Sequence, residues 1–137
     1  MISWLVLEPN YRGSLGYGDR FANQVRYEIL TSPTNDILSG IDRLITDRVA
    51  DLDKSTIGGY GYGGILTNWI ITQTTCFNAA LSGAGSVEHV SFWGMQNIPT
   101  YLAHLLGGFP WEIPQTYQNQ SAIYELHRIR TPTHIVA

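Results

Sequence analysis

Apolar residues form short continuous runs at several points along the chain. Such a run, closed by proline, asparagine or glycine, is typical of a strand that is buried on both faces of a parallel sheet. The runs predict strands at Trp4–Leu7, Ser55–Ile57, Phe77–Ser82 and Thr133–Val136.

Between these runs the apolar residues recur at the three- and four-residue spacing of helices. Thr34 and Asn35 are suited to cap a helix that ends in the polar turn Asp47–Asp53. The segment Ile65–Thr74 is apolar nearly all round, which predicts a helix inside a core. Further helices are predicted at Asp19–Leu30, Ile98–Leu106 and Ala122–Arg128.

Strands that alternate with helices indicate an α/β fold, in which helices flank a mostly parallel sheet. The chain has 137 residues and shows no internal repeat or linker, so we expect a single domain, 1–137. A domain of this length buries roughly two-thirds of the surface of its unfolded chain, which is enough for a core.

Composition narrows the range of partners. Charged residues make up 14% of the chain, against a usual ~25%, and the net charge is −3. The 8 basic residues are scattered, so no basic stripe is present to bind a nucleic acid. The low charge also indicates a surface that is partly covered by a partner, and we expect a homo-oligomer.

The single cysteine, Cys76, excludes an internal disulfide and fits a reducing compartment. We interpret it as a small buried residue. The apolar run Trp4–Leu7 stops at Glu8 and is too short for a membrane span or a signal peptide. These features predict a soluble cytoplasmic protein that does not contact a membrane, and no cofactor or metal is expected.

The glycine-rich turn after Ser55–Ile57 is the most informative motif, and it has three interpretations. Gly59, Gly61 and Gly64 match the dinucleotide fingerprint G-x-G-x-x-G, but the next strand ends without the acidic residue that binds a ribose. A phosphate-binding P-loop is also disfavoured, because no Lys-Ser or Lys-Thr pair follows the glycines. A second interpretation is purely structural, with glycines that permit a tight strand-to-helix connection.

The third interpretation is a nucleophile elbow, the turn that presents a serine in the pattern G-x-S-x-G. Residues 59–63 have this spacing, but the central residue is Gly61, which carries no nucleophile. The backbone amides at the start of the following helix are still suited to hold an anion or a carbonyl oxygen. The candidate ligand-binding residues are therefore Gly59, Tyr60, Gly61, Tyr62 and Gly63.

At this turn the chain resembles the catalytic domain of the prolyl oligopeptidase and acylaminoacyl-peptidase family of serine peptidases. Residues 10–18 are similar to the family's N-x-R-G-S-x-G-Y-G, and residues 62–69 to its Y-G-G-x-x-T-N-W. Residues 82–92 and 106–112 are similar to the region after the family's nucleophile, and residues 130–132 to the lead-in of its next strand. The resemblance covers nearly the whole chain and implies a partial α/β-hydrolase fold, a three-layer sandwich around a mostly parallel sheet.

The departures from the family pattern concern the positions of the catalytic residues. The family's serine immediately precedes Tyr-Gly-Gly, and that position is Gly61 here. The family's His-Gly-Gly-Pro loop lies before the strand at which this chain starts, and its aspartate and histidine lie beyond Ala137. The resemblance therefore implies no catalytic residue in this chain.

The leading hypothesis is a non-catalytic remnant of a serine hydrolase domain that persists as an oligomer or as a module for a small ligand or peptide. The alternative is an active peptidase or esterase with an improvised or partner-completed site, because a triad is recognised by geometry and not by sequence position. Groups available for such a site are His89, His104, His127, His134, Asp36, Asp42 and Glu88. An aromatic pocket by the elbow is a further expectation, with core packing as the simpler role of its residues, Tyr60, Tyr62, Trp69 and Trp93.

The family's sheet has one more strand, which carries the His-Gly-Gly loop and lies between the strand corresponding to Trp4–Leu7 and the elbow strand. Without it, Trp4–Leu7 either pairs directly with Ser55–Gly58 or leaves a gap that a second copy of the chain fills. Open apolar edges recruit other strands, so an intertwined homo-oligomer is the predicted outcome.

Overall fold

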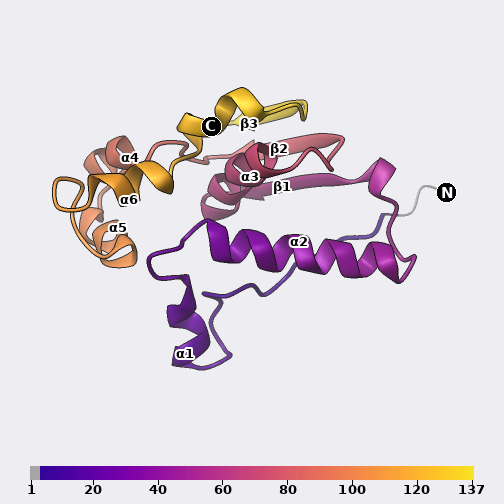
Figure 1. The fold of residues 1–137 in the computed structure, drawn as a ribbon, viewed down its shortest axis with the longest axis horizontal. Coiled ribbons are helices and arrows are strands. Elements are labelled where there is room, and N and C mark those ends of the chain that lie inside the picture. Colours follow the sequence, from indigo (N-terminus) through magenta and orange to yellow (C-terminus); the bar gives the residue numbers. More distant parts are fainter. Residues whose placement is uncertain (1–3) are drawn as a thin grey trace.

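The structure is a computed structural model that describes residues 4–137. Within this range a parallel sheet contains β1 (Thr56–Tyr60), β2 (Ala79–Gly83) and β3 (Thr133–Val136) in the order β1-β2-β3. Figure 1 shows the strands beside one another, with helices packed along the sheet and beyond its end. The predicted α/β architecture, a parallel sheet flanked by helices, is confirmed.

Helix α3 (Tyr62–Gln73) is the central element of the packing. It follows β1 directly and packs against both β1 and β2. Leu66 and Ile70 on this helix are 2% and 1% exposed. The predicted core helix is therefore confirmed, although it begins at Tyr62 and not at Ile65. It contributes to a core that also contains Ile29, Leu30, Phe77, Leu102, Leu106 and Tyr117.

Helix α2 (Thr31–Thr46) is amphipathic and turns Ile37, Leu38 and Ile41 toward the same core. It begins before the predicted cap at Thr34 and Asn35, so that prediction is wrong. The amide of Leu30, at the start of the helix, donates to Oε1 of Gln120 at 3.1 Å. A side chain 90 positions away in the sequence thus holds the start of α2, and no local pattern reveals this contact.

The remaining helices are short. The predicted helix Asp19–Leu30 is wrong, because only α1 (Asp19–Ala22) and a 3-10 turn follow before Tyr27 adopts a φ of +71°. The predicted helix at Ala122–Arg128 is present as a 3-10 helix, η3. The other short elements are η1 (Asn23–Val25), η2 (Leu52–Lys54), α4 (His89–Met95), α5 (Pro99–Leu106) and α6 (Pro114–Asn119).

Helices α4 and α6 were not predicted from the sequence pattern. Helix α4 starts at a glutamate cap, since the Glu88 carboxylate accepts hydrogen bonds from the amides of Val90 and Ser91, each at 2.7 Å. Helix α6 begins with Pro114, whose fixed φ suits the first helical position. Both helices are too short for a periodic apolar pattern to stand out.

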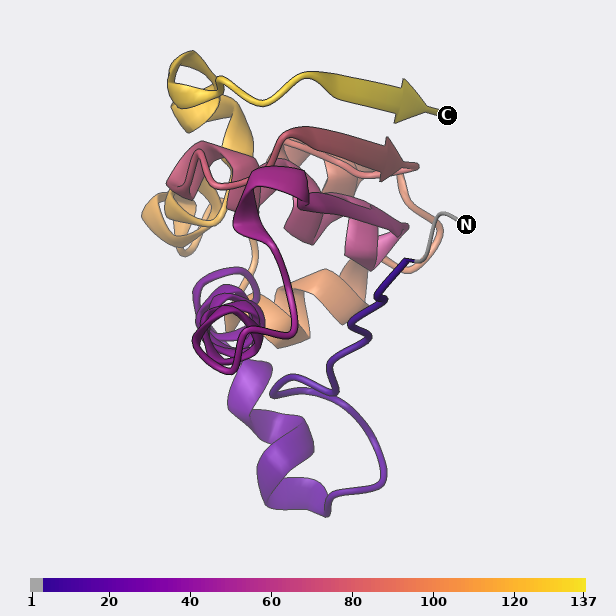
Figure 2. The same ribbon diagram turned by 90° about the vertical axis from the view of Figure 1, so that its right-hand side faces the viewer.

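The segment Trp4–Leu7 has no regular secondary structure, so the predicted strand is wrong. In the described part of the chain β1 pairs with β2 alone, and the expected pairing of Trp4–Leu7 with Ser55–Gly58 is wrong too. Figure 2 shows β3, β2 and β1 in order, with the N-terminal segment beyond β1. A groove of about 980 Å³ separates this segment from the β1 edge.

Candidate functional site

The turn between β1 and α3 has the backbone geometry of an elbow. Gly61 lies at its apex with φ +58° and ψ −118°. Its amide donates to the carbonyl oxygen of Gly83 at the end of β2, at 2.9 Å, and its own carbonyl accepts from Ile65 at 3.0 Å. These hydrogen bonds hold the apex between the sheet and the helix. A residue with a Cβ in this conformation costs about 1–3 kcal/mol, which glycine avoids.

Two further glycines let the helix approach the strands closely. A Cβ placed on Gly59 would lie 2.5 Å from the carbonyl carbon of Gly63. A Cβ on Gly64 would overlap the carbonyl oxygen of Gly83 and lie 3.0 Å from Cα of Gly85. Backbone therefore packs on backbone at both positions, and side chains are excluded there.

Gly61 differs from these two neighbours. A Cβ built on it meets no heavy atom within 4 Å, and the same holds for Gly63. The apex is thus open to a ligand approaching from outside, while the turn itself supplies no reactive group. The first-turn amides of α3 have no acceptor within the helix, which leaves them available to an anion or a carbonyl oxygen.

Tyr62, the first residue of α3, is fixed beside the apex. Its hydroxyl donates to the carbonyl oxygen of Ile29, and its ring meets Tyr11 edge-on at 6.3 Å between centroids. Burial raises the pKa of the Tyr62 hydroxyl, and the nearby Tyr11 and Tyr101 add to the rise. The side chain therefore stays a neutral donor at physiological pH and holds the start of α3 against the segment before α2.

The predicted aromatic residues do not share one environment. Tyr60 is 75% exposed, and its ring lies over Gly83 at the end of β2. Trp69 packs against the core. Trp93 also packs against the core, as the simpler role predicted, and it meets Phe109 and Trp111 edge-on at 6.2 and 5.3 Å. Of the predicted set, the structure places Tyr60 and Tyr62 next to the elbow.

Comparison with known proteins gives the family of this chain. The model of the prolyl oligopeptidase family of peptidases matches residues 3–137. The chain belongs to this family. An uncharacterized peptidase, YuxL, of Bacillus subtilis is 36% identical over 97 residues, which are 69% of this chain and 15% of that protein. The acylamino-acid-releasing enzyme of Arabidopsis thaliana is 28% identical and covers 96% of this chain.

Solved structures of two peptidases share the fold. The acylaminoacyl peptidase of Pyrococcus horikoshii superposes with a TM-score of 0.86 at 30% identity, over 92% of this chain and 21% of that one. A puromycin-hydrolyzing peptidase of Mycobacterium tuberculosis gives the same TM-score at 28% identity, over 92% and 20%. The chain spans about a fifth or less of the length of each of these relatives.

The carboxylates considered for an improvised site have other contacts. Asp36 pairs with Arg12, whose side chain reaches it at 2.7 Å and whose backbone amide reaches it at 2.9 Å. Glu88 caps α4, as described above. Asp42 is exposed on α2.

The four histidines are spread over the chain and do not meet at the elbow turn in one cluster. His89 is 1% exposed, and its ring nitrogens have no hydrogen-bond partner among the described residues. Burial lowers the pKa of His89 to about 4, against a smaller opposing effect of Glu88. His104, His127 and His134 are exposed, on α5, η3 and β3.

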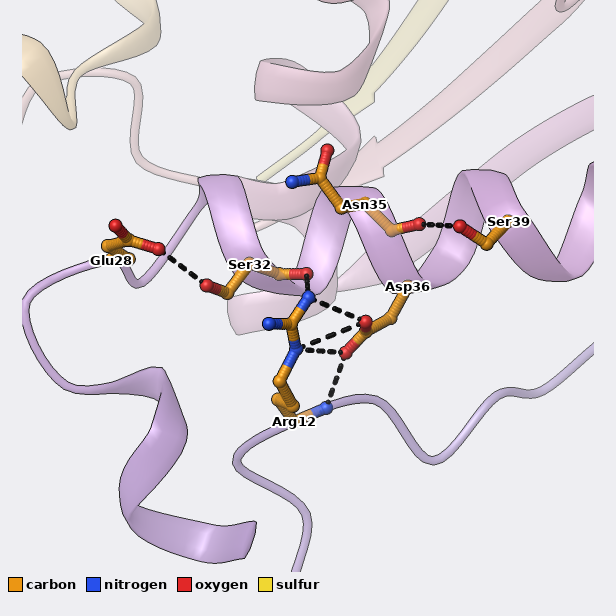
Figure 3. A network of polar contacts seen from close by, with 6 residues as sticks. All are labelled: Arg12, Glu28, Ser32, Asn35, Asp36 and Ser39. Carbon is orange, nitrogen blue, oxygen red and sulfur yellow. Dashed lines mark hydrogen bonds and ion pairs between the residues drawn. The ribbon is translucent and has the colours of Figure 1, made fainter.

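The contact of Arg12 with Asp36 was missed by reasoning from the sequence, which considered Asp36 only as a catalytic candidate. Figure 3 shows the guanidinium facing Asp36 and the carbonyl oxygen of Ser32, while the Ser32 hydroxyl donates to Glu28. The hydrogen bonds from the Arg12 side chain lower the pKa of the Asp36 carboxyl, against an opposing effect of desolvation. Arg12 lies in the motif N-x-R-G-S, and its role here is to bind the N-terminal segment to α2.

Across residues 4–137, no group of three His, Cys, Asp or Glu side chains is suited to hold a metal ion. None of the helices in this range combines the length and the apolar character that crossing a bilayer requires. Cys76 is half-buried and packs against the core.

Proposed function

We propose that this chain is a non-catalytic member of the prolyl oligopeptidase family whose glycine elbow binds a small anion or a carbonyl group. The observation that carries the proposal is Gly61. It holds the backbone conformation of an elbow apex, with φ +58°, and it has only a hydrogen atom where the family resemblance places a serine hydroxyl.

The surroundings of Gly61 favour binding of an anion over catalysis. The amides of Tyr62 and Gly63 lie at the positive end of the α3 dipole, where an anion is stabilised by about 0.3–1 kcal/mol at an exposed site. The side chain of Tyr62 is held by its hydrogen bond to Ile29, so the first turn of α3 is fixed before a ligand arrives. A preorganised pair of donors loses little entropy on binding.

Three of the candidate acids and bases, Asp36, Glu88 and His89, also favour a non-catalytic role. Asp36 is engaged by Arg12 and Glu88 by the α4 amides, so neither carboxylate is free to orient a histidine. His89 is buried and neutral, and burial removes it from contact with a substrate. A nucleophile needs an adjacent base that a third group orients in turn.

Turnover of an activated ester and labelling by a fluorophosphonate separate this proposal from the alternative hydrolase. We expect the natural chain and the Gly61→Ser variant both to match the buffer in ester turnover and to remain unlabelled. The reason is that the variant restores a hydroxyl at the apex but no base to activate it. Gly16→Ser is the matched control, because Gly16 has a φ of +94° and equally open surroundings in a loop.

Ester turnover by either protein would contradict the non-catalytic proposal. Turnover by the natural chain that survives purification would indicate an improvised site. Turnover gained only by Gly61→Ser would show that a base does face the elbow.

Binding is followed in the same preparations by the amide chemical shifts of Tyr62 and Gly63 during titration with acetate. Saturating shifts at these two amides, and not at Thr100 in the first turn of α5, are expected.

A further inference from the structure

A pocket lies between the loop that leads into α2 and helix α5, two segments that Figure 1 shows beside each other. Its volume is about 290 Å³, near the lower end of the range for small-molecule sites, which suits a ligand with a single ring. Its lining includes three polar and two aromatic side chains, Arg26, Thr100, His104, Tyr27 and Phe109. No carboxylate is among the lining residues that the structure describes, so the pocket offers hydrogen-bond donors and aromatic surface.

The loop side of this pocket has a strained backbone. Tyr27 has a φ of +71°, a conformation that is unusual for a residue with a bulky side chain. Its amide donates to the carbonyl oxygen of Leu105 at 2.7 Å. Its ring occupies the space that a side chain on Gly107 would need, since a Cβ there would lie 2.5 Å from Cε1 of the tyrosine. Strained residues that are held in this way cluster at ligand sites.

Arg26 is the cationic group of the pocket. Its Cζ lies 5.1 Å from the centroid of the Tyr27 ring, in a cation–π contact. Its Nε is buried and has no hydrogen-bond partner among the described residues. Whereas Arg12, Arg43 and Arg128 each pair with a carboxylate, the guanidinium of Arg26 forms no ion pair within residues 4–137. Its terminal nitrogens are therefore available to bind the two oxygens of a carboxylate.

The acidic residues that follow the two lining segments accept hydrogen bonds elsewhere. Glu28 accepts from the hydroxyl of Ser32 at 2.6 Å. Glu112 accepts from the amide of Phe109 at 2.8 Å. A carboxylate that enters the pocket from outside thus reaches Arg26 without displacing an acidic side chain of the chain itself.

We propose that this pocket binds the carboxylate of a small aromatic acid. The guanidinium of Arg26 binds both carboxylate oxygens, and the ring N–H of His104 is a further donor. The aromatic ring of the ligand lies against Tyr27 and Phe109, and Trp111 stacks on Phe109 at 4.8 Å between centroids and holds that ring in place. None of residues 59–63 lines the pocket, so the site is independent of the elbow.

A purely structural role is the competing explanation. The hydrogen bond from Tyr27 to Leu105 and the contact of its ring with Gly107 fasten the loop to the end of α5. Glycine at position 27 would make the same backbone hydrogen bond without strain. Fastening the loop also leaves the donors of Arg26 without an acceptor, whereas a bound carboxylate uses both the ring and the guanidinium.

The amide chemical shifts of His104 and Gly108 during titration with benzoate test the site. We expect saturating shifts with benzoate. Benzamide carries the ring without the charge, and acetate carries the charge without the ring. Both are expected to leave these amides, and that of Thr100, unchanged at the same concentrations. The amides of Tyr62 and Gly63 report on the elbow in the same spectra, so each site is judged separately.

Variants at the two loop residues separate recognition of the charge from recognition of the ring. Arg26→Gln is expected to raise the dissociation constant for benzoate at least about tenfold, because a charge-assisted pair is lost, and Arg26→Lys to raise it less. Tyr27→Gly suits the φ of +71° and retains the backbone, so we expect a rise of about threefold from loss of the ring alone. Arg48→Gln is the matched control, since it removes the same charge at an exposed residue outside the pocket, and it should leave the constant unchanged.

Several results would overturn the proposal. Benzoate that fails to saturate the pocket amides would do so, and shifts of the same size with benzamide or acetate would show that the charge or the ring is not recognised. An affinity that Arg26→Gln or Tyr27→Gly leaves unchanged would place the ligand elsewhere. Equal weakening by Arg26→Gln and Arg48→Gln would assign the effect to the net charge of the chain and not to this pocket.

Discussion

Replacement of Gly64 by alanine should lower the free energy of unfolding by about 3 kcal/mol, at the upper end of the cost of overpacking a core. The added methyl would overlap the carbonyl oxygen of Gly83 and approach Gly85 to 3.0 Å. These contacts are with backbone, which cannot rotate away as a side chain can. Relief therefore requires α3 to move off β2, and α3 is the central element of the core.

Gly63→Ala is the matched control for this variant, measured by urea unfolding. Gly63 is the preceding residue on the same helix, and a Cβ there meets nothing within 4 Å. Alanine should raise the free energy of unfolding at this position by about 0.5–1 kcal/mol, because glycine loses more backbone entropy in a helix. Equal effects of the two substitutions would show that α3 does not pack on the sheet as closely as described.

Stability should fall as the pH is lowered from about 6.5 toward 4, with His89 as the main source. The pKa of His89 is lowered to about 4 by burial, whereas an unfolded histidine has a pKa of ~6.5. Between these values the unfolded chain binds a proton that the folded chain refuses, so stability rises with pH. The full difference corresponds to about 3 kcal/mol, present above pH 6.5 and lost below pH 4.

His89→Leu isolates this contribution in urea unfolding at a series of pH values. Leucine fills a similar volume and removes both ring nitrogens, which have no hydrogen-bond partner among residues 4–137. The variant should have a shallower slope between pH 6.5 and 4.5. Below that range both proteins should lose stability to the same extent. The carboxyls of Asp36 and Glu88, whose pKa values are lowered in the folded chain, take up protons there. Parallel slopes for the two proteins down to pH 4.5 would contradict the assignment to His89.

The family and the elbow could be inferred from the sequence because their determinants are local. The strand-turn-helix order is local, Gly59 and Gly64 permit backbone to pack on backbone, and Gly61 supplies the positive φ of the turn. The core helix and the strands β2 and β3 were also predicted with boundaries within a few residues. A continuous apolar run predicts a strand correctly wherever a neighbouring element buries it.

Elements that depend on distant partners could not be inferred in this way. The prediction of a strand at Trp4–Leu7 is wrong because a strand needs a neighbouring strand as well as an apolar pattern. In the structure β1 lies across a groove from this segment. The start of α2 depends on Gln120, and the position of the N-terminal segment depends on the pair of Arg12 with Asp36. The sequence shows the residue types in each case but not which of them meet.

The sequence by itself determined that this chain has the α/β pattern and the glycine turn of its family, with no hydroxyl at Gly61, because glycine spacing and apolar periodicity act over a few residues. Only the tertiary structure decided where the carboxylates, the histidines and the first apolar run lie. Hydrogen bonds and burial between residues 24 to 90 positions apart set those places, and no short-range pattern encodes them.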